Sequence, residues 1–133
     1  MPITKNPARQ ELIQAYVDIN LADVTTGVDV EALDLPIGAV IVDGALVTTE
    51  AWNSTTSDVM DVGDGGSQNR YLNDGNIRAL AARVPLVPTG FVTTSTTNKL
   101  TVRWVSGGGS PSTGKVRLEV TYYRIGRAAF SQG

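Results

Sequence analysis

The chain has 133 residues, a formal net charge of −2, and neither Cys nor His. This length suits one domain with its own core. Without Cys and His there are no disulfides, no thiolate metal sites and no conventional Ser–His–Asp triad. A slightly acidic chain gives no electrostatic reason to expect a nucleic-acid partner. We also expect no membrane partner, since no apolar run approaches the roughly 20 residues of a membrane span and the N-terminus lacks the apolar stretch of a signal peptide.

Residues 1–11, MPITKNPARQE, are expected to form an extended N-terminal arm. Its two prolines lack an amide donor and restrict the residues before them to extended conformations. One interpretation is a frayed end. The other is an arm that orders against a neighbouring subunit. In that case Ile3 is an apolar anchor, while Lys5 and Arg9 offer charge to an acidic partner surface.

Residues 11–24 fit two periodicities. Apolar side chains at every second position from Ile13 onward favour a strand, whereas a smaller set around Tyr16 would make a short helical stripe. The strand matches more positions. Residues 28–35 begin with the same alternation and slip phase at Leu33, which predicts a β-bulge or a break between two short strands.

Residues 39–52, AVIVDGALVTTEAW, form the longest β-like run. Asp43-Gly44 within it is a strong signal for a two-residue hairpin turn of type I′. The same pair also suits a bulge or a close backbone approach within one long, bent strand. The sequence leaves both interpretations open.

The middle of the chain carries weaker signals. A short strand is expected over residues 56–62, closed by a Gly-rich turn, and Asp74-Gly75 predicts another turn. Residues 76–83, NIRALAAR, place Ala and Leu at helical spacing behind an Asn that suits a helix cap. They predict one or two helical turns, which the following prolines end.

Three strands are expected near the C-terminus. Residues 90–94 form a short one. Residues 99–105 and 115–125 alternate apolar and polar side chains with a period of two, which indicates strands with one buried face. The Gly/Ser-rich link between these two predicts that they are antiparallel neighbours. Residues 126–133 are expected to form a tail.

About eight short strands separated by turn signals indicate an all-β fold, namely an antiparallel β-sandwich or jelly roll with an extended N-terminal arm. A small closed barrel is the alternative. Nothing alternates strand with helix in the way that a parallel α/β sheet requires. We therefore expect a single β-sandwich domain over residues 1–133, with the arm at 1–11 and the tail at 126–133.

No residue stands out as catalytic, cofactor-binding or metal-binding, so we expect no enzyme activity and no cofactor. Asp58, Asp61, Asp64 and Asp74 lie close in sequence, but their spacing does not match the EF-hand loop. Acidic residues around Gly-rich turns are more often solvated turn formers. A pair of carboxylates of the glycosidase kind needs only two acids at the right separation, and nothing selects such a pair.

Three aromatic side chains are candidates for the core or for binding. Trp104 falls on the inner face of its strand and is expected in the core. Trp52 is either a core residue or a group that stacks on a sugar or a protein partner. Tyr123 faces outward, and Tyr is enriched at interfaces. The partner-binding candidates are thus Trp52 and Tyr123, beside Ile3, Lys5 and Arg9 of the arm.

Six segments carry a resemblance: LPIGAVI at 35–41, SDVMDVGD at 57–64, RYL at 70–72, LVPTG at 86–90, the Gly-rich loop before Lys115, and YYRIGRA at 122–128. Together they resemble small virion proteins of tailed bacteriophages, of the capsid decoration, or cement, type. The resemblance implies a β-sandwich or jelly-roll core that binds the outside of the capsid shell, usually as trimers around threefold or quasi-threefold points. It supplies no catalytic residue.

Two functions follow as hypotheses. The resemblance implies a homotrimeric structural protein of the virion, made in the host cytoplasm, that sits on the capsid exterior and clamps neighbouring subunits of the major capsid protein. The alternative is an adhesive, glycan-binding module associated with a head or tail fibre, in which Trp52 and exposed tyrosines stack on the ligand.

Overall fold

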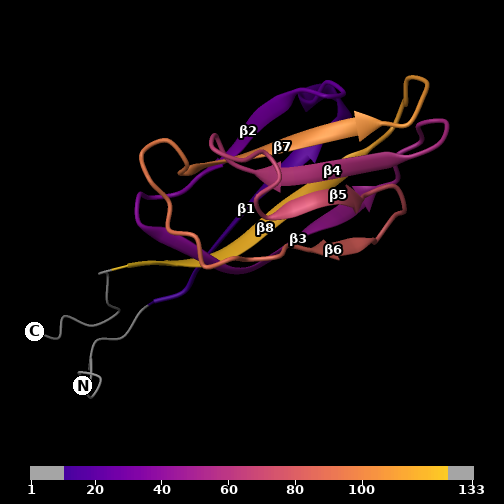
Figure 1. Ribbon diagram of the computed structural model, residues 1–133. Helices are drawn as coiled ribbons and strands as arrows, with labels where there is room; N and C mark the ends of the chain where they lie inside the picture. Colours follow the sequence, from indigo (N-terminus) through magenta and orange to yellow (C-terminus); the bar gives the residue numbers. More distant parts are fainter. Residues whose placement is uncertain (1–10, 126–133) are drawn as a thin grey trace, which may run out of the picture.

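The computed structural model describes residues 11–125. These residues form an all-β sandwich of two four-stranded antiparallel sheets (Figure 1). The elements in chain order are β1 (Ile13–Asn20), the 3-10 helix η1 (Leu21–Asp23), β2 (Asp29–Asp34), β3 (Ala39–Glu50), β4 (Asp58–Gly63), β5 (Leu72–Asn76), β6 (Arg83–Pro85), β7 (Lys99–Ser106) and β8 (Lys115–Arg124). The all-β sandwich expected from the sequence is confirmed, and no closed barrel forms among these strands.

The strand order identifies the sandwich as a jelly roll. One sheet has the order β1-β8-β3-β6 and the other β2-β7-β4-β5. Every link between consecutive strands crosses to the opposite sheet, except the link from β4 to β5. This arrangement places the first and last strands side by side, with Ile13 opposite Tyr122. The two ends of the described chain therefore leave the sandwich together (Figure 1).

The strict period-two sequence of residues 115–124 became a strand with one buried face, whereas in β7 the alternate residue Thr101 is buried as well. In β8, Val116, Leu118 and Val120 are buried while the residues between them are partly exposed. The strand interpretation of residues 13–20 is confirmed in β1, which pairs with β8 along its whole length. The phase slip in β2 is a bulge, because the register with β7 shifts between Glu31 and Leu33.

The hairpin interpretation of Asp43-Gly44 is wrong, and the long bent strand is correct. Both residues lie inside β3 and pair with β8, where the register shifts between Ile41 and Asp43. A Cβ atom on Gly44 would lie 2.6 Å from the carbonyl oxygen of Glu119. Gly is therefore required for a close approach between two strands, and not for a turn.

The predicted helical turns over residues 76–83 are absent from the structure. Asn76 ends β5, and Ile77 is fully buried, with its amide bonded to Asp58 and its carbonyl to the Thr48 hydroxyl. Ala81 then adopts a φ of 65°, which stops any helix. Burial and pairing have overridden the helix propensity of the Ala and Leu residues.

Three further predictions about connections are corrected. Strands β7 and β8 belong to different sheets, so the Gly/Ser-rich link crosses the sandwich and does not form a hairpin. Residues 90–94 contribute only an isolated bridge, Val40 to Val92, and no strand. Asp74-Gly75 lies within β5, where Asp74 has a φ of 54° beside a register shift, and so forms a bulge instead of a turn.

The core fills the space between the sheets. Its largest fully buried side chains are Trp52, Tyr71, Ile41, Leu46, Met60, Ile77, Leu100 and Leu118, followed by several valines. Burial of such side chains is the main stabilising contribution in a domain of this size. Among residues 11–125, no helix has the length and apolar character needed to cross a membrane.

Candidate interaction surfaces

Three carboxylates, those of Asp58, Asp61 and Asp64, are buried. Asp58 is completely buried and accepts hydrogen bonds from the Ser54 amide (3.2 Å), the Ser54 hydroxyl (2.5 Å) and the Trp104 indole (3.0 Å). The Arg78 guanidinium lies 3.8 Å away. Four donor groups surround this carboxylate, which therefore connects β4, β7 and two loops. Its oxygens are occupied by these partners and are not accessible to a ligand.

Two more carboxylates have the same structural character. Asp61 accepts the backbone amide of Asp74 at 2.6 Å and so holds the bulge of β5. Asp64 accepts the amides of Gly66 and Ser67 and pairs with Arg70 at 2.5 Å. The expectation that these acids are solvated is wrong for Asp58, Asp61 and Asp64, which are buried, whereas Asp74 is exposed. Within residues 11–125, no group of acidic residues is arranged to hold a metal ion.

The partly buried Arg70 side chain joins a second cluster. Its guanidinium carbon lies 3.6 Å from the centre of the Phe91 ring, which is a cation–π contact. The neighbouring Tyr71 is 1% exposed, and its hydroxyl has no hydrogen-bond partner among the described residues. Burial, reinforced by the negative charge of Asp64, raises the pKa of Tyr71 to about 12 although Arg70 opposes the shift.

Trp52 does not lie on a binding surface. It is 2% exposed, its ring centre is 5.3 Å from that of Trp104, and a Cβ on Gly114 would meet its ring. The end of the Gly-rich link therefore lies directly on the indole. Of the two interpretations of this residue, the core position is correct, and stacking on a sugar or a partner is excluded for the buried side chain.

The other candidate residues divide into two groups. Tyr123 is half-buried and faces outward on β8, opposite Val40 of β3. Ile3, Lys5 and Arg9 of the arm lie outside the described residues. Of the two candidates among residues 11–125, Trp52 is buried and Tyr123 alone lies on the surface.

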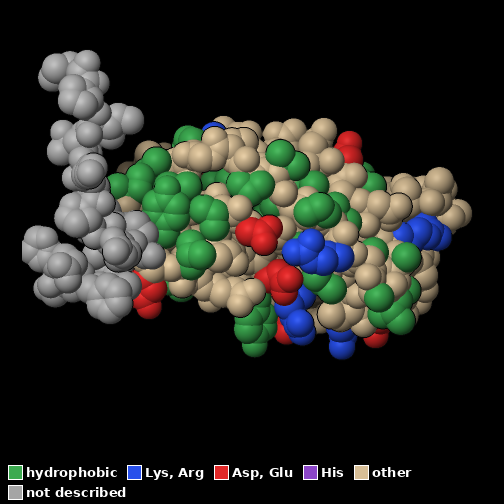
Figure 2. All heavy atoms as spheres, turned by 90° about the horizontal axis from the view of Figure 1, so that it is seen from below, with side chains coloured by type: hydrophobic (Ala, Val, Ile, Leu, Met, Phe, Trp, Pro, Cys, Tyr) green, Lys and Arg blue, Asp and Glu red, His purple; other side chains and the backbone are tan. Residues whose placement is uncertain are grey.

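Exposed hydrophobic side chains gather around Tyr123. We define the apolar end as Ile37, Val42, Val92, Tyr123 and Ile125; apart from Tyr123, these are 40–54% exposed. They lie on the β2–β3 loop, on β3, on the 86–98 segment and at the end of β8. Figure 2 shows hydrophobic side chains collected at one end of the sandwich.

Backbone hydrogen bonds hold the apolar end together. The Gly38 amide donates to Thr93, the Thr93 amide donates to Ala39, and the Ile125 amide donates to Gly38. The Thr93 hydroxyl is also bonded, to the carbonyl of Pro36 at 2.8 Å. The patch is thus built on three segments that are fixed to one another, so it is preorganised for a partner.

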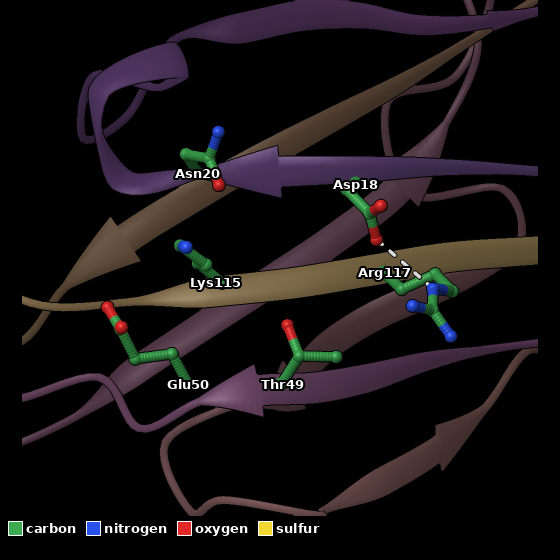
Figure 3. Close-up of a pocket in the computed structure, with 6 residues that line it drawn as sticks. All are labelled: Asp18, Asn20, Thr49, Glu50, Lys115 and Arg117. Atoms are coloured by element: carbon green, nitrogen blue, oxygen red, sulfur yellow. Dashed lines mark hydrogen bonds and ion pairs between the residues drawn. The ribbon is translucent and has the colours of Figure 1, made fainter.

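The opposite end of the same sheet face is polar. A hollow of about 490 Å³ is lined by Asp18 and Asn20 of β1, Lys115 and Arg117 of β8, and Thr49 and Glu50 of β3 (Figure 3). Asp18 and Arg117 form an ion pair at 3.1 Å. Tyr16, 64% exposed, lies beside it with its ring centre 5.4 Å from the Arg117 guanidinium. The hollow offers charged and amide groups at the surface, without a buried acid or base for catalysis.

The apolar end was missed from the sequence, although one signal pointed to it. Ile125 is in phase with Lys115, Arg117 and Tyr123 on the outer face of β8, where a solvated strand would carry polar side chains. Tyr123 and Ile125 are thus two successive outward positions with hydrophobic side chains, and they indicate an apolar surface at this end of the strand. The contributions of Ile37 and Val92 depend on loops that meet only in the fold.

Comparisons with known proteins place the fold. No protein-family model matches the chain, and no curated protein matches its sequence. The chain is similar to one in the cyanophage Pam1 capsid asymmetric unit, with a TM-score of 0.73 and 22% identity over 93% of this chain and 92% of that chain. It is also similar to a chain in the acidic stable capsid structure of Helicobacter pylori bacteriophage KHP30, with a TM-score of 0.62 and 19% identity over 84% and 86% of the two chains. The same fold thus occurs in two bacteriophage capsid structures.

Proposed function

We propose that the chain is a structural, non-enzymatic protein of a bacteriophage virion, which decorates the capsid exterior and clamps neighbouring subunits of the major capsid protein. The observation that carries this proposal is the fold match to a chain of the Pam1 capsid asymmetric unit. The residues that resemble decoration proteins are an independent support, because they were identified from the sequence.

The extent of the match favours a small separate capsid component. The alignment covers 93% of this chain and 92% of the Pam1 chain, so the two chains have nearly equal lengths. A domain of a larger shell protein would instead leave most of the other chain uncovered. This relationship supports a decoration role over a role as the shell-forming subunit.

The apolar end is the surface that we propose to contact the shell. Monomeric proteins rarely expose contiguous apolar patches unless these bind something, and this patch includes an aromatic side chain of the kind enriched at interfaces. It also lies where both ends of the described chain leave the sandwich. Residues Ile3, Lys5 and Arg9 would therefore act beside it, between neighbouring subunits of the assembly.

A trimer suits such a role. A threefold site on a shell presents three equivalent surfaces, and a trimer that matches them adds weak contacts into strong overall binding. Homotrimers on the capsid exterior, bound to the major capsid protein, are therefore part of the proposal.

Electron microscopy of intact particles tests the proposal. An antibody against this chain, carried on gold, is expected to label the whole shell. Label at one vertex or on the tail would contradict decoration of the shell and favour the fibre-associated adhesive module. In that alternative Trp52 cannot stack on a ligand because it is buried, but Tyr16 beside the polar hollow has an exposed ring.

A further inference from the structure

Among residues 11–125, no strand covers one side of the sandwich. Nearly all the partly buried hydrophobic residues that pack against the core lie on β1, η1 or β2, the exception being Val84. We define the β1–β2 seam as the inward-facing apolar residues of the two edge strands: Ile13, Ala15, Val17, Val30, Ala32 and Leu33. The opposite side is closed, because Leu72, Ile77 and Leu86 beside β5 and β6 are at most 9% exposed.

The seam combines apolar side chains with free strand edges. β1 and β2 end their respective sheets on this side (Figure 1), and among residues 11–125 each pairs with one strand only. Leu12, 60% exposed, and Val28, 48% exposed, extend the apolar strip at its two ends. Proteins usually protect such edges with Pro, Lys or a bulge, and β1 has none of these over its eight residues.

The acidic residues around the seam favour a partner that carries basic residues. Every charged residue from 11 to 35 is acidic. Asp18, Asp29 and Asp34 on the two edge strands are paired with cations of the adjoining strands, while Glu31 is exposed on β2. Every charged side chain in residues 1–10 is basic, and Ile3 adds an apolar group. The first ten residues are therefore complementary to the seam in hydrophobicity, and their cations suit the exposed carboxylate of Glu31 beside it.

We infer that the β1–β2 seam binds the N-terminal arm, residues 1–10, of a second copy of this chain. Ten extended residues span up to about 35 Å, whereas the eight residues of β1 need about 27 Å at 3.4 Å each. The arm is thus long enough to lie along the whole seam, where its backbone can pair with a free edge.

The geometry of the connection assigns the arm to a neighbour. To lie against its own β1, the arm would have to reverse direction within residues 8–12. That stretch, ARQEL, contains no Gly, Asn, Asp or Pro, the residues that favour tight turns. A turn at Asn6-Pro7 would leave too few residues to cover the seam. Arms passed from each copy to the next produce a closed ring, and a ring of three fits the proposed trimer.

Cysteine cross-linking tests this exchange directly, because the chain has no Cys of its own. The variant Ile3→Cys with Ala15→Cys places one thiol on the arm and one in the seam. The matched control is Ile3→Cys with Ala79→Cys, whose second thiol is exposed near the opposite side of the sandwich. Under mild oxidation we expect the seam pair to give disulfide-linked oligomers on non-reducing gels, at several times the yield of the control.

Other outcomes would overturn the inference. A disulfide within one chain means that the arm covers its own seam, and equal yields for both pairs mean that the arm has no preferred site. Deletion of residues 2–10 gives a second test, since sedimentation should change from an oligomer to a monomer with the fold retained. An oligomer that persists without the arm contradicts exchange. Both measurements use protein free of capsid, so they are independent of the proposed function.

Discussion

The indole N–H of Trp104 donates a hydrogen bond to the carboxylate of Asp58 at 3.0 Å, and both side chains are buried. Asp58→Ala is expected to lower the free energy of unfolding by about 3 kcal/mol, because it leaves several buried donors without an acceptor. Asp58→Asn keeps one acceptor oxygen and should cost less. Urea denaturation measures both, and an alanine variant as stable as the parent would contradict the role of this carboxylate.

Two buried threonines offer a matched comparison. The Thr101 hydroxyl has no partner among the described residues, whereas the Thr97 hydroxyl bonds the amide and the hydroxyl of Thr94. Both residues are less than 9% exposed. Thr101→Val should therefore raise the free energy of unfolding by up to about 1 kcal/mol, while Thr97→Val should lower it by about 1 kcal/mol. Denaturation midpoints that move in the same direction would contradict this assignment.

The buried Tyr71 makes stability depend on pH at the alkaline end. Its pKa rises from 10.0 to about 12 on folding, so the folded state holds this proton more tightly than the unfolded chain. The associated stability is fully present below pH 10 and is lost as pH rises toward 12, by roughly 2 kcal/mol. Tyr71→Phe should remove this part of the pH dependence, as measured by denaturation between pH 9 and pH 12. If the free energy of unfolding fell equally with pH in both proteins, the Tyr71 hydroxyl would not be the buried group that this prediction requires.

Gly44 should tolerate no side chain, because the backbone of β8 lies against its Cα. Gly44→Ala is expected to cost 2 kcal/mol or more, roughly the penalty of overpacking a close contact. Gly90→Ala is the control: its φ is +77° but no atom lies within 4 Å of an added Cβ, so only about 1 kcal/mol of backbone strain is expected. Thermal unfolding separates the two, and an equal loss at both positions would argue against the close approach.

The apolar end can be tested by placing a charge on it. Ile37 is 54% exposed and Leu80, outside the patch, is 63% exposed. Changing either to Asp should alter stability by no more than about 0.5 kcal/mol. Ile37→Asp should weaken binding to decoration-free shells about tenfold or more, because an interface would bury an unpaired carboxylate. Leu80→Asp should bind like the parent, and co-sedimentation with shells gives both values. Unimpaired binding by Ile37→Asp would remove the apolar end from the proposed contact.

Local patterns predicted the strands well where one face of the sheet meets water. The period-two sequences of β1 and β8 are examples, and the bulge in β2 was visible as a slip in phase. The link between β7 and β8 was misjudged because a Gly-rich segment of this length can either reverse a chain within one sheet or cross to another. The contacts that hold the crossing link, such as Gly114 against Trp52 and Ser112 with Asn53, exist only in the fold.

The contacts of the buried polar groups could not be predicted from the sequence. Asp58 looked like a turn residue, and its partners Trp104 and Arg78 come from distant parts of the chain. The same reason explains the helix wrongly expected over residues 76–83, where burial of Ile77 outweighs local propensity. The apolar end combines four segments, and only its part on β8 could be seen from the phase of a single strand.

The pairing of Ile13 with Tyr122 also sets the order of events during synthesis. Strand β8 lies between β1 and β3, yet it follows both of them in the sequence and is separated from β3 by four other strands. The sheet that contains the apolar end therefore closes only after β8 has been synthesised, and long-range pairings of this kind form slowly. Until then β1 and β3 lack the strand that joins them, so the surface that we propose to recognise a partner cannot yet form.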